Sequence, residues 1–158
     1  MNDLKKMMDR VLCAICAFLF SFMTIIAVYQ VVTRYVFNNP SSISEELLTY
    51  SFAWMAMFAA TLVFGERDHM RLAYFADKLS GKKKIMLAAG TELIILIFTV
   101  LVLVYGGISI TALTMTQVTA SLGIPMGYVY IIMPISGVLT AIYSIINLSN
   151  LCRQLKTQ

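Results

Sequence analysis

The chain has 158 residues, of which 59% are hydrophobic and only 13% are charged. A soluble domain carries roughly a quarter charged residues, so this composition excludes an ordinary water-soluble fold. The net charge of +4 does not indicate nucleic-acid binding, because the basic residues lie between long apolar runs and not on one polar face. The composition is that of an integral membrane protein.

The first apolar run follows the basic segment 1–10 and has no charge from Val11 to Thr33. A signal peptide has a shorter apolar region of roughly 7–15 residues, so the run predicts a retained membrane span over about residues 11–37. Cys13 and Cys16 have the C-x-x-C spacing that can mark a redox site. We favour the simpler interpretation that they are small apolar residues one helical turn apart.

Three more segments are long enough to cross about 30 Å of hydrocarbon as helices. They cover about residues 45–65, 85–113 and 126–150, and breaker residues at Gly123, Pro125 and Gly127 predict a turn before the last one. Pro134 predicts a distortion inside the fourth span. The fold class is therefore all-α, a single membrane domain over residues 1–158 with four transmembrane helices.

Eleven of the twelve lysines and arginines lie in the N-terminal tail, the central loop and the C-terminal tail, and only Arg34 lies on the other side. Cytoplasmic loops are enriched in these residues, so both termini are predicted in the cytoplasm. In the central loop, apolar residues at helical spacing predict a short interfacial helix over about residues 70–79. Its candidate lipid-headgroup anchors are Arg67, His69, Arg71 and Lys78, and an ordinary loop without lipid specificity remains an equal alternative.

Glu92 is the one acid predicted inside a span. An intramembrane carboxylate is a candidate for an ion pathway, although helix packing is the interpretation that we favour here. The single histidine, His69, does not make a metal site, and no catalytic constellation stands out. We expect no enzyme activity, no metal and no cofactor.

The segment RYVFNNPSSISEELLTYSFAWMAMFAATLVFGERDHMRL, residues 34–72, resembles the small membrane subunit of tripartite ATP-independent periplasmic (TRAP) transporters, the DctQ-like family. The resemblance includes the Arg-Tyr-x-Phe end of span one, the Ser-Glu-Glu before span two and the run LGIPMGYVYIIMPISG at residues 122–137. It implies a subunit of the bacterial inner membrane that scaffolds a large membrane subunit. That partner would carry out sodium-driven uptake of an organic acid, such as a dicarboxylate or a sialic acid, delivered by a periplasmic binding protein.

Two groups of site residues follow from this interpretation. Residues on the predicted outer side are candidates for docking the binding protein, although a capping box of Ser42 with Glu45 would explain that acid without a partner. Aromatic, small and kink-forming residues of the spans are candidates for packing against the large subunit. The docking group is Arg34, Asn38, Asn39, Glu45 and Glu46, and the packing group is Trp54, Phe58, Glu92, Pro134 and Gly137.

Two other classes of protein remain as alternatives. A small multidrug-type transporter would need a membrane carboxylate, normally in its first span, where this chain has none. A four-helix membrane thiol oxidoreductase would need cysteine pairs on the oxidising side, whereas all three cysteines are predicted near cytoplasmic ends.

Overall fold

The computed structural model describes residues 2–66 and 82–156, and the named elements in these ranges are helices. In a bilayer the backbone N–H and C=O groups have no water to bond, so apolar segments form helices that satisfy these groups internally. The elements are α1 (Asn2–Tyr35), α2 (Ser42–Glu66), α4 (Lys82–Phe98), the π-helix η1 (Thr99–Gly106), α5 (Gly107–Thr114), α6 (Gly127–Tyr130) and α7 (Ile132–Lys156).

Four of the described helical stretches are long and apolar enough to cross a membrane, which confirms the predicted architecture. The first begins earlier than expected, because α1 is helical from Asn2 and includes the charged tail. Lysine and arginine are good helix formers, so the helix continues beyond the apolar run that marks its membrane part. The predicted interfacial helix, with Arg67, His69, Arg71 and Lys78, lies outside the described residues.

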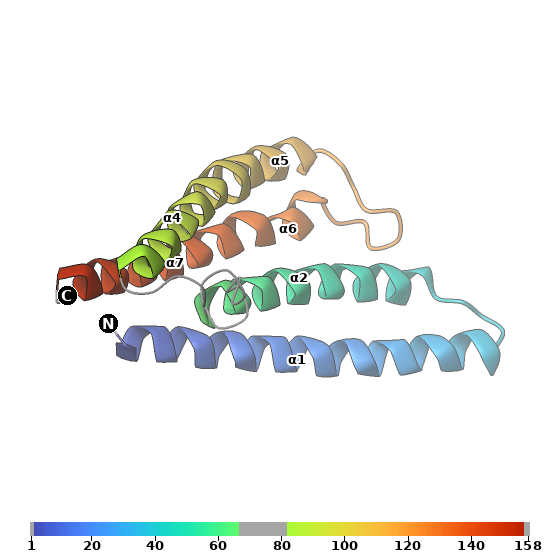
Figure 1. Ribbon diagram of the computed structural model, residues 1–158. Coiled ribbons are helices and arrows are strands. Elements are labelled where there is room, and N and C mark those ends of the chain that lie inside the picture. The colour runs from blue at the N-terminus through green and yellow to red at the C-terminus, as the bar shows by residue number, and fades with distance from the viewer. Residues whose placement is uncertain (1, 67–81, 157–158) are drawn as a thin grey trace.

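The helices form a row in which each span packs against its neighbour (Figure 1). α1 packs along α2, α2 packs along α7, and α7 also packs against α4 and η1. The two chain ends lie at the same end of the bundle in Figure 1. The small central cluster consists of Leu12, Phe58, Ile132 and Tyr143, which come from α1, α2 and α7.

The third span is one continuous helical path of α4, η1 and α5, and its middle has π-helical hydrogen bonding. The sequence did not predict this irregularity. Two glycines mark the contact of this span with the fourth one. A Cβ atom on Gly107 would lie 2.9 Å from the Pro134 ring, and one on Gly137 would lie 2.8 Å from Cβ of Leu103. Small residues at these points therefore allow the two spans to approach closely.

The fourth span is interrupted at Ile131, between α6 and α7. Pro134 has no N–H to donate to the carbonyl four residues earlier, and the helical hydrogen-bond pattern stops at that point. The distortion predicted from Pro134 is thus present, and it separates the short α6 from the long α7.

Helices α2 and α7 run in the same direction. Successive residues of α2 therefore contact successive residues of the loop between α5 and α6, then of α6, and then of α7. The Trp54 indole N–H donates to the Val129 carbonyl at 3.0 Å, and the Tyr50 hydroxyl lies 3.7 Å from the Met126 sulfur. Further along, the Thr140 hydroxyl donates to the Thr61 hydroxyl at 3.3 Å. The partners are 75 to 79 residues apart in sequence along the whole contact.

Candidate functional site

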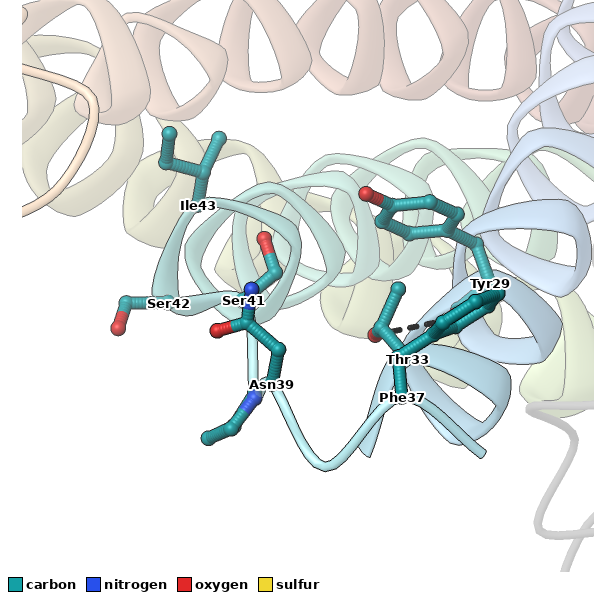
Figure 2. A pocket seen from close by; sticks show the side chains of 8 residues that line it. Tyr29, Thr33, Phe37, Asn39, Ser41, Ser42 and Ile43 are labelled. Atoms are coloured by element: carbon teal, nitrogen blue, oxygen red, sulfur yellow. Dashed lines mark hydrogen bonds between the residues drawn. The ribbon is translucent and has the colours of Figure 1, made fainter. Parts of the chain in front are cut away.

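The end of the bundle opposite the chain termini contains a hollow where α1 ends and α2 begins. Its volume is about 780 Å³. Figure 2 shows the aromatic side chains of Tyr29 and Phe37 on its α1 side, and Ser41 with Ile43 at the start of α2. The loop between the two helices contains Asn38 in a left-handed conformation with a φ of 49°. Asparagine tolerates this region better than most residues, so it suits the sharp exit from α1.

Of the five residues predicted for docking, Asn39 lines this hollow and Asn38 precedes it in the loop. Arg34 lies exposed in the last turn of α1, where a positive charge also favours the negative end of the helix dipole. These positions are exposed at one end of the bundle, as a docking surface requires. Their contact with a binding protein stays a prediction.

The N-terminus of α2 is capped by a different residue from the one that the sequence predicts. The side-chain oxygen of Ser41, not that of Ser42, accepts a hydrogen bond from the backbone N–H of Ser44, at 3.4 Å. The helix begins at Ser42, so Ser41 is the residue in the N-cap position. The predicted capping box of Ser42 with Glu45 is therefore wrong, and Glu45 lies exposed in the first turn, where its charge favours the positive end of the dipole.

Glu46 has a structural role that the sequence did not reveal. Its carboxylate accepts two backbone hydrogen bonds from the loop between α5 and α6, from the N–H of Ser121 at 3.2 Å and from that of Leu122 at 2.9 Å. These donors lie 75 and 76 residues further along the chain, so no local spacing could have indicated them. The carboxylate therefore connects the start of α2 to the tip of the loop before the fourth span.

The opposite end of the bundle holds two buried polar contacts. The hydroxyl of Tyr143, which is fully buried, donates to Oδ1 of Asp9 at 2.5 Å. The amide nitrogen of Asn147 donates to Oε1 of Glu92 at 3.2 Å. Tyr143 and Asn147 are one turn apart on α7, so this helix contacts both α1 and α4 through polar side chains. The sequence analysis identified Glu92 but not its partner, although the four-residue spacing of polar residues along α7 was a signal.

The residues predicted to pack against a large subunit all make contacts inside this chain. Phe58 and Glu92 are 8% exposed, and Trp54 bonds to Val129. Pro134 and Gly137 lie against the third span. Contact of any of them with a partner stays a prediction, and the structure assigns them to packing between the spans.

If Glu92 serves helix packing, Glu92→Gln should leave unchanged the sodium coupling that the family resemblance implies for the assembled transporter. Glutamine keeps an oxygen that can accept the Asn147 hydrogen bond, while it removes the charge that an ion pathway would need. Glu92→Leu is the matched variant, since it removes the acceptor and should lower the free energy of unfolding by about 1–3 kcal/mol. The number of sodium ions per substrate, measured from the sodium dependence of uptake, would change in the glutamine variant if Glu92 took part in coupling.

Comparison with known proteins identifies the family of this chain. Residues 23–154 match the family model of DctQ, the DctQ component of tripartite ATP-independent periplasmic transporters. The chain belongs to the DctQ family. The resemblance found in residues 34–72 is thus confirmed over most of the sequence.

Similar proteins are described as small permease proteins of TRAP transporters. A TRAP transporter small permease protein of Haemophilus influenzae is 29% identical over 141 residues, covering 89% of this chain and 87% of the relative. A second protein of that organism, with the same description, is 25% identical and covers 84% of this chain and 80% of its own length. The sialic acid TRAP transporter small permease protein SiaQ of Vibrio cholerae is 26% identical over 103 residues, which are 65% of this chain and 60% of SiaQ.

The family is one of transporter subunits and not a class of enzymes. This DctQ protein is accordingly a small permease subunit of a TRAP transporter. The family match gives no support to a multidrug-type transporter or a thiol oxidoreductase. Cys13 and Cys16 lie on α1 as free thiols, and the simpler interpretation of their spacing stays a prediction.

Proposed function

We propose that this subunit is a static scaffold in the bacterial inner membrane, with both termini in the cytoplasm, and that it supports a large membrane subunit which performs sodium-driven uptake of an organic acid. In this proposal the small subunit binds neither the sodium ion nor the substrate. It enlarges the membrane part of the transporter and contributes to the outer surface that receives the periplasmic binding protein.

The hydrogen bonding of the buried polar groups is the observation that supports the scaffold role. Within residues 2–66 and 82–156, no buried side-chain nitrogen or oxygen lacks a hydrogen-bond partner. Buried hydroxyls of Thr61, Thr111 and Thr114 donate to backbone carbonyls of their own helices, as Thr61 does to Met57, and the Thr140 hydroxyl donates to that of Thr61. A solute site in a transporter needs polar groups that can exchange water for the solute, and these groups are already bonded.

The outside of the bundle supports a role in assembly. Large apolar side chains are exposed along α1 and along the third span, among them Phe18, Ile25, Ile94 and Leu101. In a membrane such surfaces contact lipid or other helices, and neither contact needs a hydrophobic effect in water. These faces provide the area over which a large subunit and lipid can pack.

The substrate class rests on the relatives. One of them is named for sialic acid, at 26% identity, and we extend from it only the general class of carboxylate-bearing solutes. A carboxylate solute is also the class implied by the resemblance of residues 34–72.

Reconstitution tests the proposed function. The small subunit alone, the large subunit alone and the two together are placed in liposomes with an inward sodium gradient and an excess of binding protein. We expect uptake of a labelled organic acid only when both subunits are present, and background uptake from the small subunit alone. Sodium-driven uptake by the small subunit by itself would contradict the scaffold role, and uptake of a neutral sugar in place of all carboxylates tested would contradict the substrate class.

A further inference from the structure

Two adjacent acids at the start of α2 have different surroundings. Glu45 is exposed, and no hydrogen bond to its carboxylate is present among the residues that the structure describes. Glu46 is half-buried and accepts the backbone N–H groups of Ser121 and Leu122. A carboxylate that accepts two N–H groups makes stronger hydrogen bonds than a neutral acceptor would.

The loop that Glu46 holds has an internal shape of its own. It is folded back on itself like a hairpin, with Val118 bridged to Pro125 and the Thr119 N–H donating to the Ile124 carbonyl at 2.9 Å. The turn passes through Gly123, whose φ of 67° lies in the left-handed region that favours glycine. This internal bonding fixes the form of the hairpin, and at its base the Gln117 N–H donates to the Thr114 carbonyl of α5 at 3.1 Å.

Two further contacts attach the hairpin to α2. At its base, Met126 lies against the Tyr50 hydroxyl. At its tip, the two N–H groups of Ser121 and Leu122 meet the Glu46 carboxylate. Glu46 and Tyr50 are one turn apart on the same face of α2, so together they set both ends of the hairpin against this helix.

We propose that Glu46 is a positioning residue that fixes the 115–126 hairpin against α2 in the orientation that the binding protein meets, whereas Glu45 provides the exposed charge beside it. This inference rests on the proposed function, since it takes the outer end as the docking surface. A surface that is already ordered does not lose loop entropy on binding, so the fixed hairpin raises the affinity for the partner. The exposed charge of Glu45 acts on the rate of encounter and depends on salt.

The two roles separate in single substitutions. Glu46→Asp keeps the negative charge but shortens the side chain, so the carboxylate no longer reaches the loop. Glu45→Gln removes the neighbouring charge and leaves the Glu46 hydrogen bonds in place. Changing both acids together would remove the attachment and the charge at once, and it could not distinguish them.

The experiment uses the complex of small and large subunits in liposomes, in a background in which Cys13, Cys16 and Cys152 are replaced. Spin labels at the exposed positions Thr49 and Ala120 report the distance between α2 and the hairpin in the absence of binding protein. Uptake is then measured against the concentration of binding protein, at low and at high ionic strength.

We expect a narrow distance distribution for the wild type and for Glu45→Gln, and a broad one for Glu46→Asp. The Glu46→Asp complex should need about fivefold more binding protein for half-maximal uptake, equivalent to about 1 kcal/mol, at both ionic strengths. The Glu45→Gln complex should show a defect at low ionic strength that disappears at high ionic strength.

Each contrary result would contradict a different part of the proposal. An unchanged distance distribution in Glu46→Asp would overturn the positioning role of Glu46. A broadened distribution with an unchanged requirement for binding protein would overturn the link between the hairpin and docking. A wild-type complex whose uptake does not depend on binding protein at all would instead refute the proposed function.

Discussion

Gly137→Ala should lower the free energy of unfolding of the small subunit by about 1–3 kcal/mol, the usual cost of forcing extra volume into a packed contact. The new methyl group would lie 2.8 Å from Cβ of Leu103, 3.0 Å from a methyl carbon of Val104 and 3.1 Å from the backbone carbon of Leu103. A backbone atom cannot rotate away, so α7 and η1 must move apart. Fluorescence of Trp54, the single tryptophan, followed during SDS titration in mixed micelles measures the change.

Gly90→Ala is the matched control for this substitution. A Cβ atom on Gly90 would meet nothing within 4 Å, and the residue lies inside α4. Alanine is a better helix former than glycine, so this variant should be unchanged or more stable by about 0.5–1 kcal/mol. Equal loss of stability in both variants would show that the close contact of the third and fourth spans is not what Gly137 provides.

Tyr143→Phe should lower the free energy of unfolding by about 1.5–3 kcal/mol, the range for a hydrogen bond to a charged group. The substitution removes only the hydroxyl that donates to Asp9, and the fully buried ring keeps its packing. SDS titration of the purified subunit, followed by Trp54 fluorescence, measures the difference. The structure thus predicts a large effect from the loss of a single oxygen atom.

The control for Tyr143→Phe is Tyr105→Phe, in the third span, where the tyrosine is 73% exposed. Its hydroxyl has no hydrogen bond within the described parts of the chain, so stability should stay within about 0.5 kcal/mol of wild type. A double-mutant cycle with Asp9→Ala, which removes the acceptor, completes the test. If the effects of Asp9→Ala and Tyr143→Phe simply add, the hydrogen bond between the two residues contributes nothing to folding.

The spans and the turn between the third and fourth spans could be predicted from the sequence, because each depends on local composition. A run of about 20 apolar residues has few alternatives to a helix in a bilayer, and Gly123, Pro125 and Gly127 mark the turn between α5 and α6. Pro134 likewise indicates its distortion, since the missing N–H acts on the carbonyl one turn earlier. In each case the cause and the result lie within a few residues of each other.

The polar contacts between spans could not be predicted, because they depend on which helix faces lie opposite each other. In the sequence, Glu46 has no feature that separates it from a free surface charge. In the structure, its carboxylate accepts hydrogen bonds from the backbone of Ser121 and Leu122. Asp9 belonged to a charged tail that gave no sign of its bond to Tyr143. The π-helical stretch η1 is a further case, since its residues have no pattern that separates them from an ordinary α-helix.

The parallel contact of α2 with the loop, α6 and α7 has a consequence for synthesis of the chain. Every polar partner of α2 along this contact lies 75 to 79 residues downstream. At a translation rate of about 5–20 residues per second, each of these α2 residues leaves the ribosome about 4–15 s before its partner. During this interval the Glu46 carboxylate and the Trp54 N–H must be met by water or by the insertion machinery. The pair of helices α1 and α2 is therefore the early intermediate of biogenesis, and entry of the fourth span is the step that completes the subunit.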